Sequence, residues 1–374
     1  MSSIKQKAQE IFNIADIKIN GNRPWDIQVK NPKFYSKVLS GGSLALGESY
    51  MDGWWNSKAL DEFFCRVFKT RLYEKVKGMK YFIPSLIKAR IINLQRKSRA
   101  FNIGKTHYDK GNDLFMNMLD KRMNYSCGYW KPGVKNLNQA QIAKLDLICK
   151  KVGLKPGMKI LDIGCGWGSF AKYAAEKYKV KVVGITISKE QVKLAKKLCK
   201  GLPVEIRLQD YRDVNEKFDA IISVGMFEHV GVKNYRTFMK VVYKCLKDDG
   251  LFLLHTIGRN NSVSLGDPWI NKYIFSRGMI PSVKQIATTS EGFFILEDWH
   301  NFGVDYDKTL MAWYKNFNKN WNKIKKLNNY DERFYRMWNY YLLSFAGSFR
   351  ARYLQLWQIV FSKYGVKREY KRIR

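Results

Sequence analysis

Apolar and polar positions alternate with two different periods between about residue 140 and residue 258. Short apolar runs of strand length are followed by stretches in which apolar residues recur at helical spacing. The runs predict strands over 159–163, 181–186, 204–208, 218–224 and 251–257. Helices are predicted between them over 169–178, 189–200 and 234–246. Repeated strand–helix units with buried strands predict an α/β fold with a doubly wound, mostly parallel sheet.

Residues 1 to about 100 lack long strand patterns and are predicted to be helical. Twelve basic residues and a single acid, Glu74, fall between residues 66 and 105. Within this stretch apolar residues recur at helical spacing from Ile83 to Leu94, which predicts a basic amphipathic helix over 83–97. Such a helix suits an anionic lipid surface, and it equally suits packing on a neighbouring domain.

Aromatic residues accumulate from residue 290 onward. Phe334, Trp338, Tyr341 and Phe345 are spaced so that they fall on one face of a helix. Such a stripe is typical of core packing, and the alternative is the wall of an apolar tunnel.

The composition narrows the class of protein. The 374 residues are 46% hydrophobic and 15% aromatic, which supports a sizeable core and argues against disorder. The apolar stretches are too short to span a bilayer, and the charged first ten residues lack the apolar segment of a signal peptide. Six scattered cysteines form no Cys-x-x-Cys pair, so neither a disulfide framework nor a metal site is expected. These features predict a cytoplasmic protein.

The charge balance adds a prediction about partners. There are 67 basic and 32 acidic residues, a formal net charge of +35. This excess indicates a polyanionic partner, and both nucleic acid and an anionic membrane surface qualify. The alternative is a compositional bias toward lysine, which would make part of the charge a solvated surface.

The most informative motif covers residues 161–170. An apolar run that ends in Asp162 and an isoleucine is followed by Gly164, Gly166 and Gly168 and then by a helical stretch. Glycines at these positions let the main chain lie against a nucleoside. The spacing is Gly-x-Gly-x-Gly rather than the Gly-x-Gly-x-x-Gly of pyrophosphate sites, which favours S-adenosylmethionine over a dinucleotide. A purely structural glycine turn is the alternative.

The other cofactor contacts are expected in the loops at the carboxyl ends of the strands, where ligands bind in open α/β sheets. The loop after the second strand contains Thr186, Ser188 and Gln191, but it has no acid at the point where ribose hydroxyls are commonly bound. Ser188 or Gln191 would have to serve there. In the next loop Asp210 could accept from the adenine amino group, and Tyr211 could cover the ring. An ordinary turn is the alternative for this loop.

Glu228 and His255 follow the fourth and fifth predicted strands. These strands should be neighbours, so the two side chains would share the rim beside the cofactor and form an acid–base pair. The fourth loop also lacks the Asp/Asn-Pro-Pro-Tyr/Phe sequence common in enzymes that methylate amino groups of DNA bases. The absence of this sequence argues against a nucleic-acid substrate, despite the positive charge of the chain.

Several motifs in the right order carry a resemblance to a known family, among them Tyr-Ser-Cys-Gly-Tyr-Trp at 125–130. The chain resembles cyclopropane-fatty-acyl-phospholipid synthases from about residue 40 to 362. The segments that match are 46–55, 125–130, 161–168, 184–188, 209–213, 227–231, 255–258, 267–275, 298–306, 346–352 and 355–358. The resemblance implies a sheet of the class I methyltransferase type with a smaller helical N-terminal domain. It divides the chain into a lipid-interaction domain with a basic linker, 1–100, and an S-adenosylmethionine-dependent catalytic domain, 101–374.

The family's chemistry is implied in the same way. A cis double bond of a phospholipid acyl chain attacks the methyl group of S-adenosylmethionine, a carbocation forms, and a base removes a proton so that the cyclopropane closes. Water must be excluded, since it would trap the cation. Aromatic faces can stabilise the cation, which gives the aromatic C-terminal half a second possible role.

The resemblance implies that the base is a bound bicarbonate. Its implied ligands are Cys127, Glu228, His255, Ile257 through its main chain, and Tyr306. For the cofactor, motif and resemblance together predict contacts by Tyr125, Ser126, Asp162, Gly164, Gly166, Gly168, Thr186, Ser188, Gln191, Asp210 and Tyr211. One departure is Phe345, which stands where the family often has a cysteine assigned as catalytic. Either that cysteine is dispensable or this chain is inactive, and the intact bicarbonate set favours the first.

The implied partner is an anionic phospholipid bilayer, contacted from the inner face of the membrane by a peripheral protein, and a homodimer is expected. No nucleic-acid partner is expected. Two other functions stay open: a nucleic-acid methyltransferase, favoured by charge alone, and a catalytically inactive lipid-binding protein, suggested by Phe345.

Overall fold

The computed structural model describes residues 4–72, 112–263, 265–327, 329–367 and 369–374. Contacts divide them into two compact units. Unit 1 takes its described residues from Met1–Ile92, Leu265–Ser276 and Tyr306–Leu354, and unit 2 takes them from Asn93–Ser264, Arg277–Asp305 and Gln355–Arg374. Two later segments are thus grouped with the N-terminal residues, whereas the sequence-based division kept 101–374 together. The predicted boundary near residue 100 and the predicted basic helix 83–97 lie outside the described residues.

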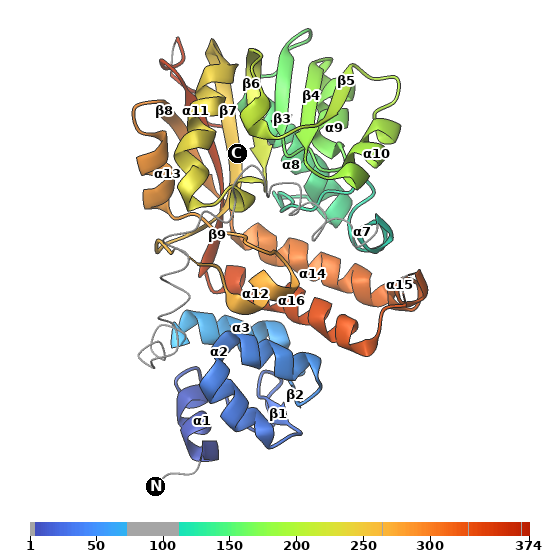
Figure 1. Cartoon of the computed structure of the whole chain (residues 1–374), viewed down its shortest axis with the longest axis vertical. Coiled ribbons are helices and arrows are strands. Elements are labelled where there is room, and N and C mark those ends of the chain that lie inside the picture. The colour runs from blue at the N-terminus through green and yellow to red at the C-terminus, as the bar shows by residue number, and fades with distance from the viewer. Residues whose placement is uncertain (1–3, 73–111, 264, 328, 368) are drawn as a thin grey trace. The chain divides into compact units, whose positions relative to one another are not determined.

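Unit 2 is built on a seven-stranded sheet with the order β5-β4-β3-β6-β7-β9-β8 (Figure 1). The strands are β3 (Lys159–Ile163), β4 (Lys181–Thr186), β5 (Val204–Leu208), β6 (Phe218–Val224), β7 (Leu246–Arg259), β8 (Ile295–Asn301) and β9 (Leu354–Ser362). β3 to β7 pair in parallel, and β8 pairs antiparallel with β9. This confirms the predicted doubly wound, mostly parallel sheet.

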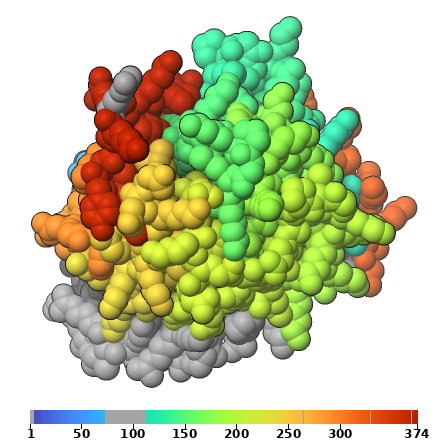
Figure 2. Space-filling model, turned by 90° about the horizontal axis from the view of Figure 1, so that it is seen from above, coloured from blue at the N-terminus to red at the C-terminus, as the bar shows by residue number. Residues whose placement is uncertain are grey.

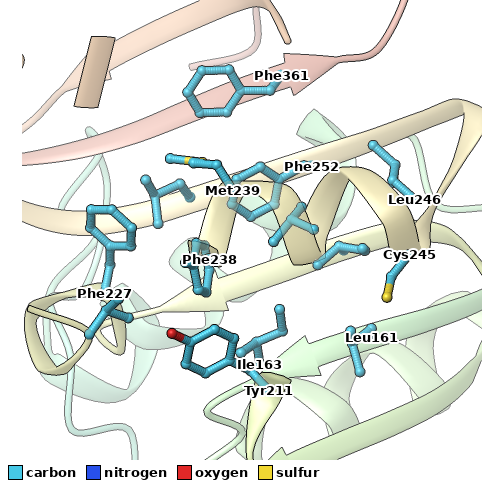
Figure 3. Close-up of a cluster of buried hydrophobic side chains, with 14 of the residues drawn as sticks. Leu161, Ile163, Tyr211, Phe227, Phe238, Met239, Cys245, Leu246, Phe252 and Phe361 are labelled. Atoms are coloured by element: carbon cyan, nitrogen blue, oxygen red, sulfur yellow. The ribbon is translucent and has the colours of Figure 1, made fainter. Parts of the chain in front are cut away.

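Helices cover both faces of this sheet. They are α8 (Leu137–Lys151), α9 (Ser169–Tyr178), α10 (Lys189–Leu198), α11 (Tyr235–Cys245) and α13 (Val283–Ser290). Alternate strand residues face opposite ways, so Leu161 and Ile163 pack against α11, while Ile160 packs against α8 and α9. Figure 3 shows the first of these clusters, with Phe238 and Met239 of α11 over the sheet. Strands buried on both faces explain why they stand out as continuous apolar runs.

Four strands and the helix α9 begin and end at the predicted residues, whereas α10 ends two residues earlier, at Leu198. The fifth strand, β7, is longer than predicted. The pair β8 and β9 was not predicted.

The remaining elements of unit 2 are shorter. They are α7 (Asn112–Met118) and three single turns, η2 (Tyr211–Asp213), η3 (Phe227–His229) and η4 (Val232–Asn234). At the end of the chain, the Tyr370 hydroxyl donates to the Lys151 carbonyl oxygen over 2.8 Å. Figure 2 shows the last residues, in red, against the green residues of α8.

Unit 1 is mainly helical, as predicted for the N-terminal region, with one pair of two-residue strands. Its elements are α1 (Ile4–Asn13), β1 (Gln28–Val29), α2 (Lys33–Met51), β2 (Trp55–Asn56), α3 (Leu60–Lys69), α12 (Pro268–Tyr273), α14 (Val304–Lys319), α15 (Trp321–Leu327) and α16 (Glu332–Arg350). α14 begins just before the division between the units. At Gly347 a Cβ atom would lie 2.4 Å from the Asp61 carbonyl oxygen, so α16 and α3 approach too closely for a side chain there.

The predicted aromatic stripe lies on α16. Successive ring centroids from Phe334 through Trp338 and Tyr341 to Phe345 are 5.7, 5.4 and 5.2 Å apart. The helix and its aromatic face are confirmed, and the tunnel wall stays a prediction. Within the described residues we find no helix with the length and apolar character needed to cross a membrane.

Candidate active site

The glycine loop joins β3 to α9. Gly164, Gly166 and Gly168 have φ values of 83°, 55° and 82°, a region that favours glycine. A Cβ on Gly164 would lie 2.7 Å from Met226 side-chain atoms, and one on Gly168 would lie 3.0 Å from Cys199 Sγ. Backbone conformation therefore favours glycine at all three positions, and close approach adds to it at Gly164 and Gly168.

A cavity lies at this loop, bounded by the carboxyl ends of β3, β4, β5 and β6. The predicted cofactor residues that line it are Tyr125, Ser126, Asp162, Gly164, Gly166, Thr186, Gln191, Asp210 and Tyr211. Gly168 and Ser188 stand at helix starts instead: Gly168 precedes α9, and Ser188 Oγ accepts from the Gln191 backbone nitrogen at 3.3 Å. Of the two residues considered for the ribose hydroxyls, the cavity wall therefore contains Gln191.

Two acids in the cavity wall have different environments. Burial raises the pKa of Asp162 to about 7, and the positive charge of Lys144 opposes this shift. Asp210 is instead held by the Arg212 guanidinium, with nitrogen–oxygen distances of 2.7 and 2.8 Å. Tyr211 lies beside it and packs on Phe238, with ring centroids 5.3 Å apart.

Sequence reasoning missed part of the cavity wall. Lys144 of α8 and the polar residues Asn124 and Ser169 also line it. No sequence signal identified Lys144, because its burial on α8, three positions after the buried Gln141, is visible only in the folded chain. A lysine on the buried face of a helix indicates a polar network rather than a solvated charge.

The predicted acid–base pair, Glu228 and His255, lies at the carboxyl ends of β6 and β7. The two strands are paired, with Val224 opposite His255, as expected from the sequence. Glu228 Oε1 accepts from the backbone nitrogen of Ile257 at 2.7 Å, and the Glu228 carbonyl oxygen accepts from Met279 N at 2.7 Å. The turn that carries Glu228 is thus fixed to β7 and to the following loop.

Glu228 and His255 are both buried, and each has one polar atom to spare. Glu228 Oε2 and His255 Nε2 have no hydrogen-bond partner among the described residues. Burial raises the pKa of Glu228 to about 7. The pKa of His255 is held well below its usual value by burial and by the positive charges of Lys144 and Lys151, so the ring is neutral. Buried polar atoms are normally hydrogen-bonded, so each of these two atoms lacks a partner that a folded chain usually supplies.

Cys127 and Tyr306 were also predicted to be catalytic, and each lies in its own surroundings. Cys127 is buried, and its Sγ lies 3.1 Å from the Gly128 carbonyl oxygen. Tyr306 belongs to unit 1, where its ring stacks on Phe349 with centroids 4.6 Å apart. A joint role of Tyr306 with the residues of unit 2 stays a prediction. Phe345 also belongs to unit 1.

The strand order, the glycine loop after the first strand of the sheet and the cavity define the class I methyltransferase fold. Residues 95–359 match the family model of mycolic acid cyclopropane synthetase. The chain is 57% identical over 356 residues to a cyclopropane-fatty-acyl-phospholipid synthase of Escherichia coli strain K12, covering 95% of this chain and 92% of that protein. The chain therefore belongs to the cyclopropane synthase family.

Solved structures agree with this assignment. The cyclopropane synthase MmaA2 from Mycobacterium tuberculosis superposes with a TM-score of 0.66 at 32% identity, over 70% of this chain and 98% of that one. Mycolic acid cyclopropane synthase CmaA1, in complex with SAH and CTAB, gives a TM-score of 0.65 at 33% identity, with the same coverage.

Proposed function

We propose that this chain transfers a methylene group from S-adenosylmethionine to a cis double bond of an unsaturated phospholipid acyl chain, forming a cyclopropane. The observation that carries the proposal is the 57% identity, over 95% of the chain, to a protein named cyclopropane-fatty-acyl-phospholipid synthase. The cavity at the glycine loop supports it, because its wall combines apolar and polar side chains at the carboxyl ends of the strands, where ligands bind in this class of fold.

The chemistry requires an electrophilic methyl group, a dry site and a base. The alkene of the lipid attacks the sulfonium methyl of the cofactor, and the resulting carbocation loses a proton from that methyl group as the ring closes. The buried position of Glu228 and His255 suits this step, since water near the cation would give an alcohol instead.

We infer that the base is a bicarbonate ion held by Cys127, Glu228, His255, the Ile257 main chain and Tyr306. Glu228 and His255 fit such a group, since each has a buried polar atom without a described partner, whereas the Ile257 backbone nitrogen already donates to Glu228 Oε1. Gln358 Nε2, a donor, lies 3.2 Å from His255 Nδ1, so Nδ1 accepts and Nε2 carries the hydrogen of the neutral ring. Glu228 Oε2 can share a proton, because the pKa of this carboxyl is raised to about 7. When bound, bicarbonate would supply the oxygen that takes the proton from the transferred methyl.

The lipid would be reached at a negatively charged membrane surface. One side of α10 and the turn after it carries a stripe of exposed lysines, and no described acid forms an ion pair with any of them. The stripe consists of Lys189, Lys193, Lys196, Lys197 and Lys200. These positions recur at helical spacing, and clustered exposed lysines are attracted to anionic lipid. A peripheral membrane protein and a homodimer remain our expectations.

The proposal is tested by incubating the protein with S-adenosylmethionine, bicarbonate and vesicles of cis-unsaturated anionic phospholipid. Mass spectrometry should then show a gain of one CH2 group per modified acyl chain. A product that gains CH2 together with water or with two hydrogens would indicate a hydroxylated or branched chain instead. Methyl transfer to nucleic acid and not to lipid would indicate a nucleic-acid methyltransferase.

Phe345 motivates the second candidate function, a catalytically inactive lipid-binding protein. This side chain packs edge-on against Tyr341 in unit 1, in the aromatic stripe of α16. Binding of S-adenosylhomocysteine without any lipid product, with bicarbonate supplied, would favour that candidate over the enzyme.

A further inference from the structure

A buried ammonium group lies in the wall of the cofactor cavity. Lys144 of α8 is 1% exposed, and its side chain lines the cavity together with Asn124, Ser126 and Asp162. Its Nζ lies 2.9 Å from Ser126 Oγ and 3.0 Å from Asn124 Oδ1. Burying a charged amine costs free energy unless hydrogen bonds and opposite charge compensate it. A buried lysine at a ligand cavity therefore suggests a role in binding.

The chemistry of the donors fixes the direction of each hydrogen bond in this network. A lysine ammonium can only donate, so Ser126 Oγ and Asn124 Oδ1 are acceptors. Asn124 Oδ1 also accepts from Ser169 Oγ at 2.9 Å, and Asn124 Nδ2 donates to Asp120 Oδ2 at 3.0 Å. The Ser126 hydroxyl hydrogen is then left to point away from Lys144, and it is available to a ligand in the cavity.

Two hydrogen bonds that do not involve Lys144 also hold this loop. Gln141 Nε2 donates to the Ser126 carbonyl oxygen at 2.8 Å, and the Asn124 backbone nitrogen donates to Asp120 Oδ1 at 2.8 Å. These bonds hold the main chain on either side of Tyr125. Removing the lysine amine should therefore change the orientation and charge of the wall more than its backbone.

The charge of this wall selects for one part of the cofactor. S-adenosylmethionine carries a sulfonium and an ammonium, both positive, and a single anionic group, the carboxylate of its methionine part. An ammonium paired with a hydroxyl donor suits a carboxylate. Asp162 stands on the cavity wall as well, and its charge interaction with Lys144 is attractive.

We propose that Lys144 is a positioning residue that turns the Ser126 hydroxyl into a donor for the carboxylate of the cofactor's methionine part. This inference rests on the proposed use of S-adenosylmethionine. It goes beyond that proposal because it assigns a subsite and a residue that acts through another. It also predicts that Lys144 contributes to the affinity for the cofactor only when the carboxylate is present.

The test compares two ligands by calorimetry: S-adenosylhomocysteine, and the analogue of it that lacks the carboxylate. The wild-type chain should bind the first more tightly by roughly 10- to 100-fold, the range expected for a hydrogen bond to a charged group. Lys144→Met should lose most of this preference, chiefly through weaker binding of S-adenosylhomocysteine. Ser126→Ala should behave alike, and adding Lys144→Met to Ser126→Ala should change little more. Lys144→Arg should recover part of the preference.

Lys151→Met is the matched control, since Lys151 lies two turns later on α8 and is equally buried. Its Nζ lies 3.1 Å from His300 Nδ1 and 3.4 Å from Asp298 Oδ2, away from the Ser126 network. This variant should keep the wild-type preference even if its melting temperature falls. Equal weakening of both ligands by Lys144→Met, or additive effects of the two changes in the double variant, would overturn the proposal. A wild-type chain that binds neither ligand would instead refute the proposed cofactor.

Discussion

Glu228 Oε1 lies 2.7 Å from the backbone nitrogen of Ile257, so a carboxylate from the β6 loop is fixed by the main chain of β7. This bond uses one carboxylate oxygen and leaves Oε2 buried without a partner among the described residues. His255 lies two residues before Ile257, and its Nε2 is likewise buried without a partner among the described residues. The pairing of β6 with β7 thus brings both residues to the carboxyl ends of these strands, and each keeps one buried polar atom without a described partner.

Glu228→Gln should abolish turnover while sparing the cofactor. The amide keeps the size of the side chain but cannot share or release a proton, so we expect cyclopropane formation to fall by about 100-fold or more. Binding of S-adenosylhomocysteine should stay within a few-fold of wild type, because Glu228 is not in the wall of the cofactor cavity. Glu176→Gln, on the exposed side of α9, is the control and should keep full activity. Near-normal turnover of Glu228→Gln would remove this residue from the mechanism.

The same substitution should stabilise the fold at high pH. The pKa of Glu228 is raised from 4.5 to about 7 by burial. Between these values the folded chain binds more protons at this site than the unfolded chain, so its contribution to the free energy of unfolding falls as pH rises. At pH 8 the loss is roughly 3 kcal/mol. Urea unfolding should therefore show Glu228→Gln gaining on wild type between pH 5 and pH 8.

The pKa of Glu216 is shifted in the opposite direction to that of Glu228, so urea unfolding should show the opposite pH dependence. The Glu216 pKa is lowered to about 2 by Arg207 and Lys159, so its stabilising contribution is present above pH 4.5 and is lost as pH falls toward 2. Glu216→Gln should accordingly lose stability relative to wild type at neutral pH, by a small amount because this ion pair is partly exposed to solvent, with the Glu216 side chain 32% exposed. A pH-independent difference between wild type and Glu228→Gln would show that Glu228 is not the buried acid described above.

Gly164→Ala should weaken cofactor binding. The new Cβ would lie 2.7 Å from Met226 and would sit on a residue with φ of 83°, so the loop must move at the cavity wall. We expect binding of S-adenosylhomocysteine to weaken by about 10-fold or more. Gly201→Ala is the control, since its φ is 82° and nothing lies within 4 Å of the added atom. Calorimetry that finds both variants equally impaired, or neither, would contradict a role of close approach at Gly164.

Reversing charge on α10 should weaken attachment to anionic vesicles. Lys193→Glu combined with Lys197→Glu changes the net charge by four and places acids in the middle of the lysine stripe. In co-sedimentation the affinity should drop by more than 10-fold, since each lysine near such a surface contributes about 1 kcal/mol. The matched control reverses the charges of Lys155 and Lys217. Both are exposed and precede β3 and β6, so they lie at the amino ends of the strands, away from the cavity at the carboxyl ends. If both pairs weaken binding equally, net charge rather than α10 is responsible.

The sequence predicted the centre of unit 2 well and its edge poorly. Buried parallel strands such as β3 are continuous apolar runs, and Gly164 ends the strand by its conformation, so both ends were visible locally. β8 and β9 pair antiparallel, although 52 residues separate the end of one, at Asn301, from the start of the other, at Leu354. No local pattern specifies such a pairing.

The site shows the same contrast. Glu228 and His255 follow from the rule that ligands bind at the carboxyl ends of strands, and their strands are indeed neighbours. Cys127 and Tyr306 rested on resemblance, because neither follows a predicted strand. Lys144 was missed because its partners Asn124 and Ser126 lie about twenty residues away in an irregular segment, and only the folded chain brings them to α8.

The most direct test of cyclopropane formation uses S-adenosylmethionine with a CD3 methyl group and vesicles of cis-unsaturated phospholipid. Ring closure removes one hydrogen isotope from the transferred methyl, so mass spectrometry should find acyl chains that retain CD2 and have lost the double bond. Glu228→Gln should give no such product. Acyl chains that retain the whole CD3 group would contradict ring closure, and lipid without any deuterium would contradict the proposed function itself.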